Sequence, residues 1–264
     1  PFTGSKLVDN FIYYDGFSSL LKLRNNKYDI SITAFPSNRW EFNVFAFLIG
    51  AKKRITHSYK VGQIRTLSFL QNCKVPADEK LHDIEQNLKL LNLLKIKKPT
   101  NKKPVFHLEK EDVKFAKEYI KKSHINGLRL IGVHAGSGPL SFKRASVERF
   151  VRQIDASWEK NSAVLIFGNR EEAEIKNELS KQLRKKHLIV DADLKKVAAL
   201  ILNCKLFITN DTGLMHIAST GFDTQIVAFF CGSNPKRTRP FGKKNKLIIL
   251  KDSIMRYPFY ATKN

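Results

Sequence analysis

The chain has 264 residues, of which 42% are hydrophobic and 11% aromatic, a composition that excludes a disordered protein. It has no apolar run of about eighteen residues, so no membrane-spanning helix is predicted. The formal net charge of +23 favours acidic partners (nucleic acid, an anionic membrane face or a phosphorylated substrate), although the scattered lysines suit a general solvated surface equally well.

The first hundred residues alternate between helical and β-rich segments. The predicted helices cover residues 17–24, 38–48 and 81–91, and the predicted strands cover residues 29–34 and 54–56. We interpret residues 1–96 as a partial α/β lobe on the N-terminal side. Residues 97–104, KKPTNKKP, are polar and bounded by prolines, which predicts a linker that acts as a hinge between two lobes.

The C-terminal half shows a regular alternation of apolar strands and amphipathic helices. The predicted strands cover residues 128–133, 163–167, 188–190, 206–209, 225–230 and 247–250. The predicted helices begin after the N-cap residue Ser146, near residue 173, at Leu194 and near Leu214. Continuous apolar strands separated by helices are typical of a parallel sheet covered on both faces. We therefore predict a Rossmann-like domain over residues 105–250, followed by a tail over residues 251–264.

Ligands of such domains lie beyond the carboxyl ends of the strands. The first candidate site there is HAGSGP at residues 134–139, whose small Gly136 and Ser137 allow backbone N–H groups to approach an anion. Lys143 or Arg144 follows and could balance a phosphate charge. An ordinary glycine-rich turn explains this segment equally well.

The second candidate site is NDTGLMH at residues 210–216, between a strand and a helix. Asp211 and Thr212 stand at capping positions, Gly213 permits close approach, and His216 follows one turn later. A plain helix cap and a structural histidine are the alternative interpretation. The third candidate site is FGNREE at residues 167–172, where Glu171 or Glu172 could accept hydrogen bonds from a ribose or simply face solvent.

In this order, the segments GVHAGSGPLSFKR, IFGNREE, ADLKKVAALILNCKLFITNDTGLMHIAST and QIVAFFCGSNPKRTRP resemble the donor-binding half of glycosyltransferase family 9, the lipopolysaccharide heptosyltransferase family. The resemblance covers residues 128–240 and extends more faintly to RNNKYDI and LIGAKKRI in the first lobe. It implies a GT-B fold of two Rossmann-like lobes with parallel sheets, the N-terminal lobe being incomplete.

The resemblance also implies a set of donor contacts. The residues implied at the donor phosphates and sugar are Gly136, Ser137, Lys143, Asp211, Thr212, Gly213 and His216. Glu171 or Glu172 is implied at the ribose, and the segment from Ala192 to Leu194 at the adenine. No metal ligand is implied.

The chain departs from the family pattern at three places. Ala145 stands where the family has a tryptophan. The segment that carries the family's general-base aspartate is absent, and Asp15 does not stand in its context, so the catalytic residue is unknown. The sequence also stops soon after Tyr260, before the family's closing helix, and we therefore expect a chain truncated at both ends.

By this resemblance the protein is expected to transfer a sugar, heptose from ADP-heptose, with inversion to a lipopolysaccharide-core or related glycolipid acceptor. An ADP-sugar is the implied co-substrate, and no cofactor is implied. The three scattered cysteines suit a reducing cytoplasm, and the basic surface suits peripheral contact with an anionic membrane. Two alternatives remain open: a nucleotide-sugar 2-epimerase of the same fold, and a basic nucleic-acid-binding protein.

Overall fold

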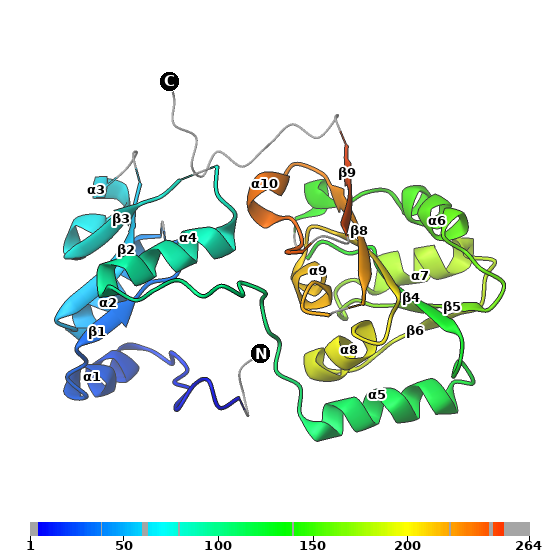
Figure 1. The fold of residues 1–264 in the computed structure, drawn as a ribbon, viewed down its shortest axis with the longest axis horizontal. Helices are drawn as coiled ribbons and strands as arrows, with labels where there is room; N and C mark the ends of the chain where they lie inside the picture. The colour runs from blue at the N-terminus through cyan, green and yellow to red at the C-terminus, as the bar shows by residue number, and fades with distance from the viewer. Residues whose placement is uncertain are drawn as a thin grey trace. The chain divides into compact units, whose positions relative to one another are not determined.

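A computed structural model of the chain describes residues 5–37, 39–59, 63–78, 80–138, 140–221, 223–242 and 245–250. These residues form two compact units. One unit contains residues 8–102, and the other contains residues 103–250 together with residues 5–7 (Figure 1). Each unit is built on a parallel sheet, so the predicted α/β class with two parallel sheets is confirmed. The predicted tail at residues 251–264 lies outside the described residues.

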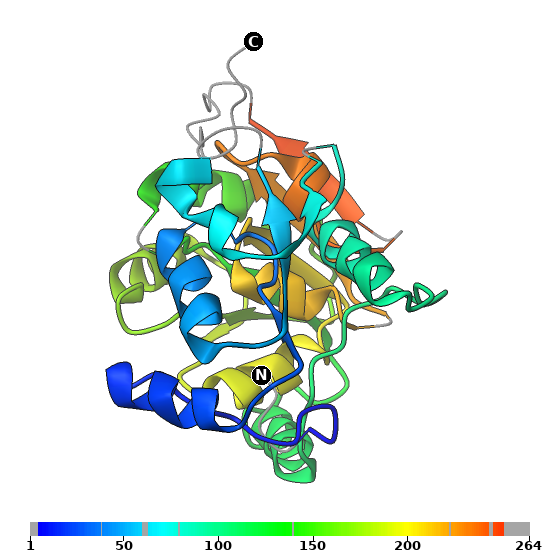
Figure 2. The same cartoon turned by 90° about the vertical axis from the view of Figure 1, so that its left-hand side faces the viewer.

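The smaller unit contains a three-stranded sheet in the order β1-β2-β3. Its strands are β1 (Ile30–Ile32), β2 (Lys53–Ser58) and β3 (Cys73–Pro76). Its helices are α1 (Phe17–Asn25), α2 (Trp40–Ile49), α3 (Gln63–Thr66) and α4 (Asp83–Lys89), with 3-10 turns η1 (Ser68–Leu70) and η2 (Leu90–Leu94). Figure 2 shows α2 and α4 on opposite sides of this sheet.

The larger unit contains a six-stranded sheet in the order β6-β5-β4-β7-β8-β9, with all neighbouring strands parallel. The strands are β4 (Arg129–His134), β5 (Ser162–Ile166), β6 (His187–Ile189), β7 (Leu206–Asn210), β8 (Gln225–Phe230) and β9 (Asn245–Ile249). In chain order this is 3-2-1-4-5-6, the order of doubly wound nucleotide-binding folds. The strand order reverses between β4 and β7, and ligands of such folds bind at that reversal.

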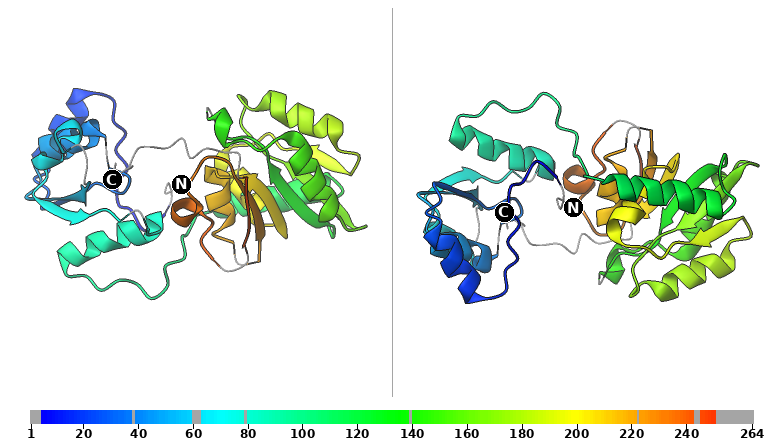
Figure 3. Two further views of the ribbon diagram at one scale, coloured as in Figure 1. Left: turned by 90° about the horizontal axis from the view of Figure 1, so that it is seen from above. Right: turned by 90° about the horizontal axis from the view of Figure 1, so that it is seen from below.

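Helices cover both faces of the large sheet (Figures 1 and 3). One face packs against α6 (Val147–Ala156) and α7 (Ala173–Gln182), and the other against α5 (Lys110–Lys122), α8 (Leu194–Ile201) and α9 (Gly213–Ala218). Side chains of a strand point alternately to its two faces. On β5, accordingly, Val164 belongs to the α6–α7 side and Leu165 to the α5–α8–α9 side, and both are fully buried.

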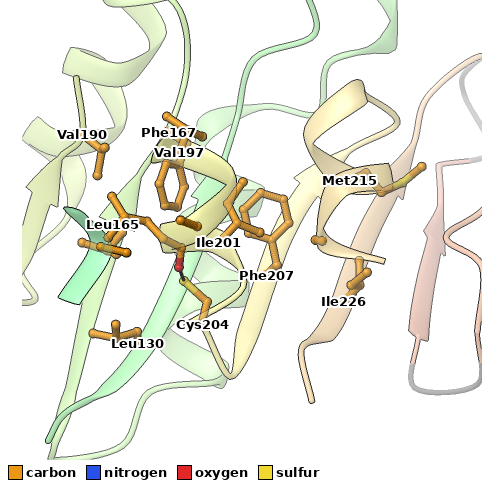
Figure 4. Close-up of a cluster of buried hydrophobic side chains, with 14 of the residues drawn as sticks. Leu130, Leu165, Phe167, Val190, Val197, Ile201, Cys204, Phe207, Met215 and Ile226 are labelled. Atoms are coloured by element: carbon orange, nitrogen blue, oxygen red, sulfur yellow. Dashed lines mark hydrogen bonds between the residues drawn. The ribbon is translucent and has the colours of Figure 1, made fainter. Parts of the chain in front are cut away.

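Figure 4 shows the core on the second side, where the rings of Phe167 and Phe207 pack with Cys204 beneath α8. Gly132 on β4 is required by this packing. A Cβ atom there would lie 2.6 Å from the Phe207 ring and 3.1 Å from Cys204 Sγ and from the Phe167 ring. The strand therefore carries glycine because no side chain has room.

Among the described residues, no helix combines the length and apolar character needed to span a bilayer.

Candidate functional site

The two candidate turns lie at neighbouring positions of the large sheet. His134 at the end of β4 pairs in register with Thr209 of β7, so the segments that follow both strands leave the same edge of the sheet side by side. This edge is the carboxyl edge, at the reversal of strand order. The sequence placed these turns after separate strands, and the structure brings them together.

Asn210 fastens the two turns to each other. Its side chain is fully buried, and its Nδ2 donates to the carbonyl oxygens of Ala135 (2.8 Å) and Gly136 (3.0 Å). Its Oδ1 accepts from the backbone N–H of Ala145 at 3.0 Å. One amide thus uses both its donors and an acceptor to fix the β4 turn and the segment that carries Lys143.

The turns that follow β4 and β7 form a corner at the carboxyl edge of the sheet. Asp211 brings a cation, Lys143, to this corner. Its Oδ2 lies 3.5 Å from Lys143 Nζ and accepts from Thr238 Oγ1 of α10 (Pro235–Thr238) at 3.2 Å. The side chains of Lys143 and Asp211 are 17% and 4% exposed, so this ion pair is largely withdrawn from water. In such surroundings charges interact more strongly than on the surface.

The start of α9 follows directly after Asp211 of this ion pair. Thr212 is the N-cap residue, but its side chain does not cap the helix; its Oγ1 lies 3.1 Å from His134 Nδ1 instead. Gly213 is exposed, and a Cβ atom added there would meet nothing within 4 Å. The backbone at the start of α9 is therefore open to an approaching group. His216 is exposed one turn further on.

Glu172 anchors the glycine turn from the neighbouring strand connection. It is 6% exposed; its Oε1 accepts from the N–H of Gly138 at 3.0 Å, and its Oε2 accepts from the N–H of Asn169 at 3.1 Å. His134 Nε2 lies 3.0 Å from the same Oε2. A Cβ atom on Gly136 would lie 1.9 Å from Oε1, so the turn requires glycine at this position.

Burial alone would raise the pKa of Glu172, but the contacts of its carboxylate have the larger effect. The hydrogen bond and charge of His134, with the backbone N–H groups of Gly138 and Asn169, lower the pKa of Glu172 from 4.5 to about 2. The carboxylate is therefore ionised at neutral pH and acts only as an acceptor.

The remaining predicted residues are less closely grouped. Ser137 is buried and donates its hydroxyl to Leu140 O within its own turn, at 2.9 Å. Glu171 is exposed, whereas the carboxylate of Glu172 is held inside the protein, so a ribose contact stays a prediction that suits Glu171 better. Ala192 is half-buried and Leu194 is 46% exposed, both after β6 at the carboxyl edge.

Three residues of this corner were not among the predicted contacts: His134, Asn210 and Thr238. His134 and Asn210 end their strands and are buried polar side chains, 5% and 0% exposed. A polar residue at the end of an apolar strand was the signal for both, but their partners lie 38 to 78 residues away along the chain. In the part of the chain that the structure describes, no group of three or more His, Cys, Asp or Glu side chains is placed to hold a metal ion.

This arrangement is that of a doubly wound α/β domain whose candidate site lies at the reversal of strand order, and comparison with known proteins gives the family. Residues 18–256 match glycosyltransferase family 9 (heptosyltransferase), and the chain belongs to this family. The family match supports neither of the two alternatives raised from the sequence, the epimerase and the nucleic-acid-binding protein.

Individual relatives agree with this assignment. Lipooligosaccharide heptosyltransferase 2 of Campylobacter jejuni is 31% identical over 130 residues, which are 47% of this chain and 40% of that protein. Lipopolysaccharide heptosyltransferase 2 of Salmonella typhimurium is 33% identical over 93 residues, 33% of this chain and 26% of that protein. The matched segments thus span well under half the length of these relatives.

Solved structures share the fold. A family 9 glycosyltransferase of Veillonella parvula has a TM-score of 0.76 at 23% identity, covering 93% of this chain and 70% of that chain. ADP-heptose lipopolysaccharide heptosyltransferase II of E. coli has a TM-score of 0.69 at 20% identity, covering 90% and 73%. E. coli heptosyltransferase WaaC with ADP has a TM-score of 0.67 at 14% identity, covering 90% and 72%.

Proposed function

We propose that the protein is an inverting glycosyltransferase that takes heptose from ADP-heptose and transfers it to a lipopolysaccharide-core or related glycolipid acceptor. The observation that carries this proposal is the corner between β4 and β7. There Lys143 Nζ lies 3.5 Å from Asp211 Oδ2, next to a helix start that is open at Gly213.

A diphosphate is the group that this corner suits best. The ammonium of Lys143 supplies positive charge, and the backbone N–H groups at the start of α9 supply donors, as helix starts do for phosphates. Asp211 holds the lysine in place through the ion pair between its Oδ2 and Lys143 Nζ.

The same groups would promote the reaction. An acceptor hydroxyl attacks the anomeric carbon on the face opposite the leaving group, the carbon–oxygen bond to the diphosphate breaks, and the diphosphate gains negative charge. Donors fixed in advance at the site of developing charge stabilise the transition state more than water does. Asn210 and Glu172 keep both turns fixed, so little reorganisation is needed.

The solved relatives support the choice of donor. E. coli heptosyltransferase WaaC, which shares the fold, has been solved with ADP and with ADP-2-deoxy-2-fluoro heptose. The acceptor proposal is supported by curated relatives that are lipooligosaccharide and lipopolysaccharide heptosyltransferases. A net charge of +23 suits a phosphorylated glycolipid and peripheral contact with an anionic membrane on the cytoplasmic side.

Calorimetric titration with ADP and ADP-heptose tests the site. Lys143→Ala should weaken ADP binding by about 1.5–3 kcal/mol, roughly 10- to 150-fold, because a hydrogen bond between charged groups is lost. Lys205→Ala is the matched control, since this exposed lysine lies at the opposite end of β7. Equal ADP affinity in the wild type and both variants would overturn the site assignment.

A further inference from the structure

His134 forms a hydrogen-bonded chain from a carboxylate to a hydroxyl beside the proposed diphosphate site. Its Nε2 lies 3.0 Å from Glu172 Oε2, and its Nδ1 lies 3.1 Å from Thr212 Oγ1. The imidazole is 5% exposed, so water does not compete for these contacts. The chain joins the end of β4 to the turn before α7 and to the start of α9.

The direction of the hydrogen bonds follows from the carboxylate. The ionised Glu172 can only accept, so His134 Nε2 must carry a hydrogen. The other ring nitrogen, Nδ1, has two possible states. Without a hydrogen it accepts from the hydroxyl of Thr212; with one it donates to Thr212 Oγ1.

The hydroxyl of Thr212 has a single hydrogen to give. The neighbouring Thr209 donates its own hydroxyl hydrogen to Asn210 O at 2.9 Å, so at 3.4 Å from Thr212 Oγ1 it offers only a lone pair. Thr212 is half-buried and its side chain makes no cap bond to α9. When His134 carries both hydrogens, Thr212 accepts from the ring, and its own hydrogen can leave the long 3.4 Å contact with Thr209 Oγ1 for a stronger acceptor outside.

We propose that an anionic oxygen of the bound diphosphate accepts this hydroxyl hydrogen, and that binding therefore takes up a proton at His134 Nδ1. His134 is a positioning residue, because it acts on the ligand through Thr212. The inference rests on the proposed function and deepens it: the site senses the negative charge of its ligand and binds more tightly as the pH falls.

The charged groups around His134 agree with proton uptake on binding of the diphosphate. Glu172 faces the ring from the turn before α7, and Asp211, which pairs with Lys143, immediately precedes Thr212 after β7. Lys176 of α7 donates to Gly168 O at 3.2 Å. With Glu172 negative on one side, a diphosphate on the other favours the doubly protonated, positive ring.

Proton uptake is measured by calorimetric titration at about pH 7 in two buffers that differ in their enthalpy of protonation. The ligand is ADP-glucose, a diphosphate diester whose own charge does not change near neutral pH. The wild type should take up a fraction of a proton. His134→Gln, which keeps a donor towards Glu172 but cannot titrate, should bind several-fold more weakly and lose the uptake.

Thr212→Val keeps the shape of the side chain and removes the hydroxyl. It should also abolish the uptake, although His134 is still present, and Thr212→Ser should restore it. His187→Gln is the control: this half-buried histidine starts β6 at the opposite edge of the sheet, and its loss should leave the uptake unchanged.

Undiminished uptake in either His134→Gln or Thr212→Val would overturn the inference, as would uptake that disappears only in His216→Gln. Imidazole nitrogen resonances of the wild type supply a measurement that needs no substitution. They should show a larger protonated fraction at His134 Nδ1 with ADP-glucose bound than in the free protein. Failure of the wild type to bind ADP or ADP-glucose at all would instead contradict the proposed function.

Discussion

Glu172 contributes to both stability and site geometry through one carboxylate. Its two oxygens accept from the backbone of two different turns and face His134, so ionisation is favoured although the group is buried. Removing such a group lowers the free energy of unfolding by more than removing an exposed contact does, because the buried donors lose their partner.

The lowered pKa of Glu172 predicts a pH-dependent contribution to stability. The folded pKa of about 2 lies below the ordinary 4.5, so the stabilisation is fully present above pH 4.5 and is lost as the pH falls through about 2. Urea unfolding should show Glu172→Gln destabilised by about 3 kcal/mol near neutral pH, with the difference from wild type shrinking near pH 3. Glu171→Gln, the exposed neighbour, is the control. A deficit of the same size at both pH values would contradict this explanation.

At the scale of elements, the site depends on how closely the β4 turn packs against the start of α7. That contact is made by Gly136 and the carboxylate of Glu172, which leave no room for a methyl group. The start of α9, by contrast, is open at Gly213. Glycine at position 136 is thus explained by the lack of space for a side chain, whereas glycine at position 213 leaves the backbone open.

Alanine substitutions at the two glycines should differ in their effect on stability. Gly136→Ala places a Cβ atom 1.9 Å from Glu172 Oε1 and should lower the free energy of unfolding by about 1–3 kcal/mol, the usual cost of overpacking. Gly213→Ala meets no atom within 4 Å and should change stability by less than about 0.5 kcal/mol. Thermal and urea unfolding of both variants measures the contrast, and similar stability of the two would refute it.

Most helices and strands could be predicted from the sequence, strands with continuous apolar residues most accurately, and β3 and α5 are among the elements that were missed. β5, β7 and β8 were predicted within a residue or two because their buried residues are contiguous. β3 was missed because Cys73–Pro76 is short, contains a lysine and ends in proline. α5 was missed because ten of its thirteen residues are not buried, and only Asp112, Ala116 and Ile120 are.

The site was predictable as a set of turns but not as a network. Small residues and a lysine after β4, and NDTG after β7, indicated anion contacts from local chemistry alone. The contacts that hold the turns together, from Asn210 to Ala145 and from His134 to Thr212, span 65 and 78 residues. No local pattern specifies which distant groups a buried amide or imidazole will meet.

At the scale of the whole molecule, two parallel-sheet units and membership of glycosyltransferase family 9 agree with the chemistry of the corner between β4 and β7. The net charge of +23 adds a general attraction for phosphates, which strengthens encounter but does not select a ligand. The proposed selection of the donor rests on a few fixed groups of the larger unit, Lys143, Asp211 and Thr212.

A crystal structure of the protein grown with ADP-2-deoxy-2-fluoro heptose shows where the donor diphosphate binds. We expect diphosphate oxygens within hydrogen-bonding distance of Lys143 Nζ, of the Thr212 hydroxyl and of the backbone N–H groups at the start of α9. A diphosphate bound elsewhere, in contact with neither the β4 turn nor the start of α9, would contradict the proposed diphosphate site.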